Sequence, residues 1–188
     1  MKLYFIRHAQ RGYGEEQDTL TEEGVEQAQK LAKYLCKFEI DKIICSSLNR
    51  TRKTVEPTLA ILHVPVEFTD EVIEQKNGIL QGRTAEEYRT ALRESGLTKE
   101  EFRPEGGENE SDAYHRAERF VQKLKKQKEQ NILIISHAGF ISNIVVILLK
   151  KSKEERKNYK SDFCALTYFE LDDHFNVLDY RTNQKTIS

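Results

Sequence analysis

The stretch KLYFIRHAQ (2–10) decides the fold, because an apolar run, Leu3–Ile6, leads directly into the pair Arg7–His8. A short continuous apolar run of this kind predicts a strand that is buried on both faces of a sheet. Two more runs have the same character, KIIC (42–45) and ILII (132–135). Each run precedes a segment with helical signals. The alternation therefore predicts an α/β fold with a mainly parallel sheet and helices on both faces.

The helical signals can be read residue by residue. Thr21, followed by two glutamates, suits the start of the first helix. Apolar residues then recur at helical spacing and predict one buried face, made of Val25, Ala28, Leu31, Ala32 and Leu35. In the second helix, Ser46 or Ser47 is expected to form the N-terminal cap, and Pro57 to kink or break the helix.

The rest of the chain continues the pattern. Helices are expected over about 84–95, over 110–128 and directly after the strand ILII, in GFISNIVVILLKK. The chain is expected to end in two strands, 165–171 and 176–181. The stretch 95–109 has no strong periodicity and is expected to be an excursion over the edge of the sheet.

Composition restricts the class of protein. The chain has 188 residues, 38% hydrophobic and 32% charged, which is typical of a single domain spanning 1–188. Its net charge of -1 gives no general basic face for nucleic acid. Three scattered cysteines argue against a disulfide framework or a metal knuckle, and favour a reducing compartment. No apolar run is long enough for a signal peptide or a membrane span. We therefore expect a cytoplasmic protein with no membrane partner.

Charged and titratable residues follow three of the predicted strands. Arg7–His8 ends the first strand, Ser136–His137 ends the strand ILII, and Arg50 follows the strand KIIC. Because ligands bind at the carboxyl ends of strands in such sheets, we expect these side chains to lie at one rim. Each histidine alone is more often structural, and each arginine alone is more often solvated. Their coincidence is what indicates a site.

This set of residues suits phosphoryl transfer. Two arginines can hold a phosphate by paired hydrogen bonds, and a neutral imidazole with one nitrogen anchored is a nucleophile. The leaving oxygen needs a proton donor at the same rim, and Glu74 is the candidate. No carboxylate or cysteine with ligand spacing accompanies the histidines, so we expect no metal and no cofactor.

The motifs also resemble a known family, the histidine phosphatase superfamily, which is also called phosphoglycerate-mutase-like. The resemblance runs in order from residue 3 to about 145. It rests on IRHAQ (6–10), LTEEGVEQAQKLAKYL (20–35), CSSLNRTRKT (45–54), VIEQKNGILQG (72–82), PEGGENESD (104–112) and ISHAGFIS (135–142). The resemblance implies a three-layer α/β/α sandwich around a mostly parallel central sheet.

The resemblance also implies roles for individual residues. His8 is similar to the histidine that becomes phosphorylated, and Arg7 and Arg50 to the arginines of the phosphate pocket. His137 is similar to the second pocket histidine, which hydrogen-bonds the transferring phosphoryl group. Glu74 matches the proton donor of the family's Glu-x-x-x-Gly branch.

The chain departs from the family pattern after the first histidine. RHGE[ST]xxN becomes RHAQRGYG, so that Arg11 replaces a small hydroxyl residue and Gly14 replaces an Asn. Arg11 is therefore a candidate substrate-binding residue, and so is Arg83. The alternative for both is a solvated loop arginine. Leu80 stands where the family often has an aromatic residue, which predicts a different substrate wall.

The leading hypothesis is a metal-independent phosphomonoesterase that acts on a phosphorylated small molecule through a phosphohistidine. A cofactor-dependent phosphoglycerate mutase is the first alternative. Family mutases carry a longer, basic segment after the Glu74 stretch, and here that segment is short. A non-catalytic protein that binds phosphate esters is the second alternative. The physiological substrate and the oligomeric state are left open by the sequence.

Overall fold

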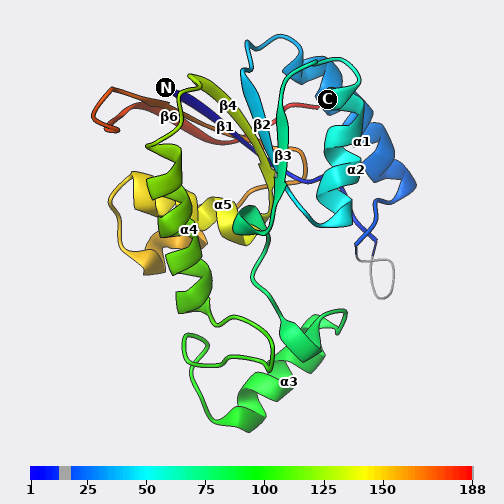
Figure 1. Cartoon of the computed structure of the whole chain (residues 1–188). Coiled ribbons are helices and arrows are strands. Elements are labelled where there is room, and N and C mark those ends of the chain that lie inside the picture. The colour runs from blue at the N-terminus through cyan, green and yellow to red at the C-terminus, as the bar shows by residue number, and fades with distance from the viewer. Residues whose placement is uncertain (13–17, 188) are drawn as a thin grey trace.

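The computed structural model describes residues 1–12 and 18–187 and contains a six-stranded sheet (Figure 1). The strand order is β3-β2-β4-β1-β5-β6. The strands are β1 (Lys2–Arg7), β2 (Lys42–Ser46), β3 (Val66–Thr69), β4 (Asn131–Ser136), β5 (Leu166–Leu171) and β6 (Val177–Gln184). The first four are parallel, whereas β5 runs antiparallel to β1, and β6 antiparallel to β5. The predicted mostly parallel sheet and the two C-terminal strands are confirmed.

Helices cover both faces of the sheet, as predicted. In β1, Leu3 and Phe5 belong to the apolar cluster that contains residues of α4 (Glu110–Leu124) and α5 (Ala138–Leu148). Tyr4 and Ile6 belong to the opposite cluster, with residues of α1 (Glu22–Leu35) and α2 (Asn49–Leu59). Because successive side chains of a strand point to opposite faces, one continuous apolar run supplies both layers. The result is the three-layer α/β/α sandwich.

The first helix confirms the predicted N-terminus and corrects one residue of the buried face. The Thr21 hydroxyl accepts a hydrogen bond from the backbone N–H of Gly24 at 3.0 Å. Val25, which the periodicity places on the buried face, is 47% exposed. The reason is that Gly24 turns inward instead: a Cβ there would overlap the carbonyl oxygen of Gln10.

For the second helix, the predicted serine cap and the predicted break at Pro57 are wrong. Neither Ser46 nor Ser47 caps α2, because its N-cap is Leu48, which has no side-chain cap. The carboxylate of Asp18 accepts from the backbone N–H of Asn49 at 3.1 Å instead. Pro57 does not break the helix, which ends two residues later, at Leu59. Proline lacks one N–H donor of the helical ladder, and here only two helical residues follow it.

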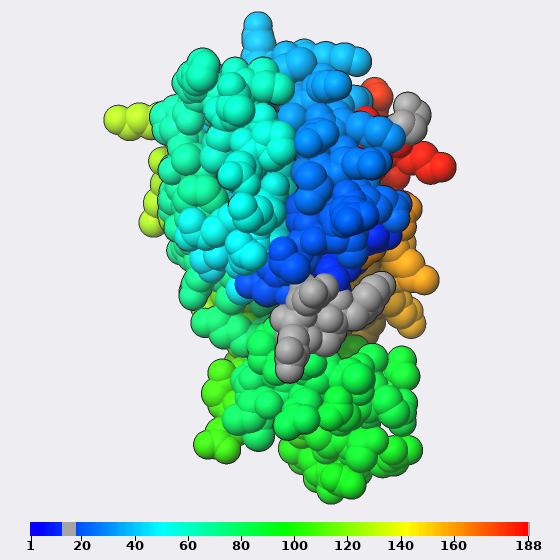
Figure 2. All heavy atoms as spheres, turned by 90° about the vertical axis from the view of Figure 1, so that its right-hand side faces the viewer, coloured from blue at the N-terminus to red at the C-terminus, as the bar shows by residue number. Residues whose placement is uncertain are grey.

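A separate lobe, defined here as residues 76–108, leaves the sheet after β3 (Figure 1). The chain passes the short helix η2 (Asp70–Val72), enters the lobe through η3 (Gly78–Leu80), forms α3 (Ala85–Ser95) and returns to α4. The predicted helix over 84–95 and the loose stretch 95–109 both belong to this excursion. Figure 2 shows the lobe, in green, as a distinct mass below the body of the molecule. One more short helix, η4 (Lys153–Asn158), connects α5 to β5.

Within the part of the chain that the structure describes, no helix is long and apolar enough to cross a membrane.

Candidate active site

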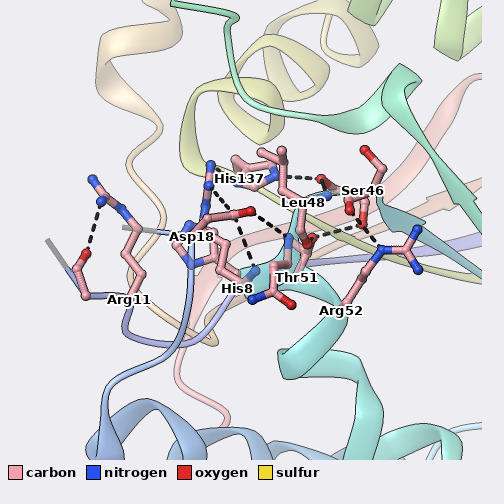
Figure 3. Close-up of polar contacts among 12 residues, drawn as sticks. His8, Arg11, Asp18, Ser46, Leu48, Thr51, Arg52 and His137 are labelled. Carbon is pink, nitrogen blue, oxygen red and sulfur yellow. Dashed lines mark hydrogen bonds and ion pairs between the residues drawn. The ribbon is translucent and has the colours of Figure 1, made fainter. Parts of the chain in front are cut away.

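The two predicted histidines lie together at the carboxyl ends of parallel strands (Figure 3). His8 follows β1 and His137 follows β4, and their ring centroids lie 5.1 Å apart. A pocket of about 370 Å³ opens beside them. Its walls come from the strand ends, from the Glu74 segment and from the lobe: Arg7, His8, Arg11, Leu48, Arg50, Ile73, Glu74, Gln75, Lys76, Asn77, Gly78, Gln81 and Gly106. His137 is fully buried and lies behind this wall.

His8 is held in one tautomer by its own main chain. Its side chain is 3% exposed, and Nδ1 lies 2.7 Å from the carbonyl oxygen of Ala9. Because a carbonyl can only accept, Nδ1 carries the proton and donates it. Nε2 therefore keeps its lone pair. Burial and, to a smaller extent, the nearby arginines lower the pKa of His8 from 6.5 to about 3, although the hydrogen bond to Ala9 acts to raise it. The ring is therefore neutral at physiological pH.

His137 is also neutral, with the opposite tautomer. Its Nδ1 lies 3.2 Å from Nη2 of Arg50, and a guanidinium can only donate. Nε2 therefore carries the proton and donates it to the hydroxyl of Ser46 at 2.8 Å. Burial, together with His8 and the arginines, lowers the pKa of His137 well below its ordinary value.

Two arginines line the pocket, Arg7 from the end of β1 and Arg50 from the first turn of α2. Arg7 donates to the carbonyl oxygen of Ser161 at 2.7 Å and stacks on the ring of Phe163, 4.0 Å from its centroid. Arg50 donates Nη1 to the carboxylate of Asp18 at 2.9 Å. Burial lowers the pKa of both guanidinium groups. Within the described chain, the Nε atom of each is buried without a hydrogen-bond partner. The two cations together suit an anionic ligand in the pocket.

Glu74 lines the same pocket as the two arginines. Its Oε2 accepts from the backbone N–H of Gly139 at 3.1 Å, at the start of α5, and its Oε1 accepts from the N–H of Gln75 at 3.2 Å. A Cβ on Gly139 would overlap Oε1 of Glu74. The carboxylate is thus held beside a helix N-terminus by a glycine that permits the close approach.

The two candidate substrate-binding arginines occupy different places. Arg11 lines the pocket, donates to the carbonyl oxygen of Gly12 at 3.1 Å and is one of the charges that depress the pKa of His8 (Figure 3). Arg83 lies outside the pocket: it pairs with Glu87 and lines a neighbouring cleft of about 500 Å³. Gly14, the other departure from the family pattern, lies outside the described residues.

Sequence reasoning missed three residues of the site. Asp18 holds Arg50, Phe163 contacts both Arg7 and His8, and Arg116 binds the segment that carries Glu74. None has a local motif, because each contacts a residue far away in the sequence. Among the described residues, no group of three or more His, Cys, Asp or Glu side chains is arranged to hold a metal ion.

The fold and this site define a class of protein, and comparison with known proteins confirms it. Residues 3–184 match the histidine phosphatase superfamily (branch 1), and the chain belongs to that family. The family and the enzyme class predicted from the motifs, phosphoric monoester hydrolases, are confirmed.

Individual relatives are named phosphatases. The chain is 27% identical to the adenosylcobalamin/alpha-ribazole phosphatase of Escherichia coli, over 95% of this chain and 94% of that protein. It is 26% identical to phosphoserine phosphatase 1 of Hydrogenobacter thermophilus, over 95% and 90%. Among solved structures, the alpha-ribazole phosphatase of Shigella flexneri superposes with a TM-score of 0.82 at 26% identity, covering 100% of this chain and 98% of that one.

Proposed function

We propose that the chain is a metal-independent phosphomonoesterase that forms a phosphohistidine at Nε2 of His8. One observation carries the proposal: Nδ1–H of His8 donates to the carbonyl oxygen of Ala9, which leaves the lone pair on Nε2. The ring is buried and lines a pocket that also contains the guanidinium groups of Arg7 and Arg50. A neutral imidazole held in this way is a nucleophile toward phosphorus. The whole of 1–188 forms one domain in this proposal.

In the first step, Nε2 of His8 attacks phosphorus while the bond from phosphorus to the leaving oxygen breaks. Protonated Glu74 gives its proton to that oxygen, so that a neutral alcohol departs. Arg7 and Arg50 neutralise the phosphoryl oxygens in the transition state. His137 holds Nη2 of Arg50 from behind, and its direct contact with the phosphoryl group remains a prediction.

In the second step, water attacks the phosphohistidine. The Glu74 carboxylate accepts a proton from this water, the phosphorus–nitrogen bond breaks, and inorganic phosphate is released. His8 returns to its neutral form, and Glu74 returns to the acid. The cycle is balanced without a metal or a cofactor.

We propose a small-molecule phosphate ester as the substrate and the cytoplasm as the location. The pocket volume of about 370 Å³ is that of a small-ligand site. The substrates named for the relatives, alpha-ribazole phosphate and phosphoserine, are therefore the first to test, together with sugar phosphates, nucleotides and phosphoglycerates.

The first experiment measures hydrolysis of p-nitrophenyl phosphate by the purified chain in the presence of a chelator. His8→Ala should lower kcat/KM by at least about 10³-fold, because the nucleophile is lost. The matched control is His115→Ala, which removes an exposed histidine of α4. Enzyme that is quenched in alkali during turnover of a phosphate-labelled substrate should carry labelled phosphate on histidine, and the His8→Ala variant should not.

Three results would contradict the proposal. An active His8→Ala variant would exclude the covalent step, and tight binding of phosphate esters without turnover would indicate a binding protein. Isomerisation of phosphoglycerate that outpaces phosphate release would indicate a mutase.

A further inference from the structure

Arg116 of α4 makes an unusually complete set of contacts that the proposed chemical steps do not use. The residue is 8% exposed. Nη1 donates to the carbonyl oxygens of Glu71 at 3.1 Å and Ile73 at 2.9 Å, and Nη2 donates to that of Glu74 at 3.2 Å. These three contacts all go to the main chain of the segment that carries the proposed proton donor.

The other side of the guanidinium is held by one carboxylate. Nε and Nη2 of Arg116 donate to the two oxygens of Glu108 at 2.9 and 2.8 Å. Both side chains are nearly buried, at 10% and 15% exposure. Burial acts to raise the pKa of Glu108, but the hydrogen bonds from Arg116 and from the Lys76 backbone, together with the charges of these two residues, lower it on balance. A bidentate, largely desolvated pair of this kind fixes the guanidinium plane.

Glu108 also connects the two chain segments where the lobe joins the body. Its Oε2 accepts from the backbone N–H of Lys76 at 3.0 Å, and its own N–H donates to the carbonyl oxygen of Lys76 at 2.8 Å. The side-chain amide of Gln75 donates to the carbonyl oxygen of Glu108 at 2.9 Å. Arg116 and Glu108 therefore hold the Glu74 segment from both sides.

The Glu74 segment needs such contacts because no regular element fixes it. Residues 73–77 lie between η2 and η3, outside any helix or strand. The Glu74 carboxylate itself is tied only to the backbone N–H groups of Gly139 and Gln75 within the described chain. The direction of this side chain thus depends on where the backbone at 73–75 is held.

We propose that Arg116 is a positioning residue that sets the place of Glu74 relative to the leaving oxygen, an inference that rests on the proposed function. A guanidinium has five donors in a fixed plane, and here they satisfy three carbonyl groups and one carboxylate. A lysine at this position cannot span the same acceptors. Loss of the clamp displaces the proton donor but leaves the nucleophile and the phosphate pocket in place.

The test compares substrates that differ in their need for the proton. Arg116→Lys should lower kcat/KM for an alkyl phosphate by about 10- to 100-fold, because proton transfer is worth about 10²- to 10⁴-fold and depends on geometry. The loss for p-nitrophenyl phosphate, whose leaving group needs little protonation, should stay within about 3-fold. The inhibition constant of inorganic phosphate should not change. The matched control is Arg119→Lys, an exposed arginine on the same helix.

A second variant and a double-mutant cycle separate positioning from a purely structural role. Glu108→Gln weakens the clamp from its other side and should give the same selective loss, even if Arg116→Lys does not fold. In the Glu74→Gln background, Arg116→Lys should cause no further loss for the alkyl phosphate, because the two residues act as one unit.

Equal losses for both substrates, or additive losses in the cycle, would overturn the role of Arg116. If Glu74→Gln itself shows no dependence on the leaving group, the proposed function fails first, and the inference about Arg116 fails with it. The two failures are thus distinguishable.

Discussion

Gly139 lies directly against the carboxylate of Glu74. Its N–H donates to Oε2, and a Cβ would overlap Oε1. We predict that Gly139→Ala displaces the carboxylate and lowers kcat/KM for alkyl phosphates by about 10- to 100-fold. Because Gly139 lies in α5, where alanine has the higher helix propensity, the free energy of unfolding should stay equal or rise.

Urea unfolding and steady-state kinetics of the same variant check both halves of this prediction. A loss of stability that parallels the loss of activity would show that Gly139 serves packing rather than the approach of Glu74. Full activity would mean that the carboxylate can move without consequence.

Which site residues can be predicted depends on how local their signal is. Arg7, His8 and His137 end predicted strands, so the rule for parallel sheets is enough to bring them together at one rim. Glu74 follows a strand less clearly, and its assignment needs the family motif. The remaining residues, Asp18, Phe163 and Arg116, act across long sequence separations, and no periodicity or spacing marks them. Their roles depend on tertiary contacts that only the folded chain defines.

At the level of elements, the N-terminus of α2 has an unusual cap. Asp18, from the loop before α1, accepts from the backbone N–H groups of Asn49 at 3.1 Å and Arg50 at 3.5 Å. A cap supplied by a distant residue explains why the predicted serine cap directly before the helix is wrong. The same carboxylate also binds the guanidinium of Arg50. One residue therefore fixes both the helix end and a pocket arginine.

We predict that Asp18→Ala lowers the free energy of unfolding by about 1 kcal/mol, the usual effect of removing an N-terminal cap. Asp18→Asn should retain most of the stability, because an amide oxygen still accepts from the helix and the half-exposed charge contributes little. Urea denaturation of the two variants at neutral pH measures the difference. Equal stability of Asp18→Ala and wild type would exclude the capping role.

At the level of the whole molecule, body and lobe contribute different parts of the site. The body supplies Arg7, His8 and His137 from strand ends and Arg50 from the first turn of α2. The lobe supplies the outer wall, and its place relative to the sheet could not be predicted, because α3 has no buried residue that ties it to either core of the sheet. Glu74 lies where the two parts join. The contacts of Arg116 and Glu108 at this junction therefore matter for the site as a whole.

The two buried histidines also couple the site to the stability of the whole chain. Their pKa values are lowered by folding, that of His8 to about 3, so the unfolded chain binds more protons than the folded chain below about pH 6.5. The contribution of the two neutral histidines to the free energy of unfolding should therefore be complete above about pH 6.5. Below that pH, the free energy of unfolding should fall as the pH decreases, by up to about 1.4 kcal/mol per pH unit for each histidine.

Urea unfolding in phosphate-free buffers from about pH 5 to about pH 7.5 measures this slope above the range in which carboxylates titrate. His8→Gln should reduce this slope by up to about 1.4 kcal/mol per pH unit, which corresponds to one proton. The double variant with His137→Gln should reduce it by up to twice that amount. A slope that is the same in wild type and in both variants would mean that the two rings are protonated alike in the folded and unfolded chain, against the neutral forms that their hydrogen bonds require.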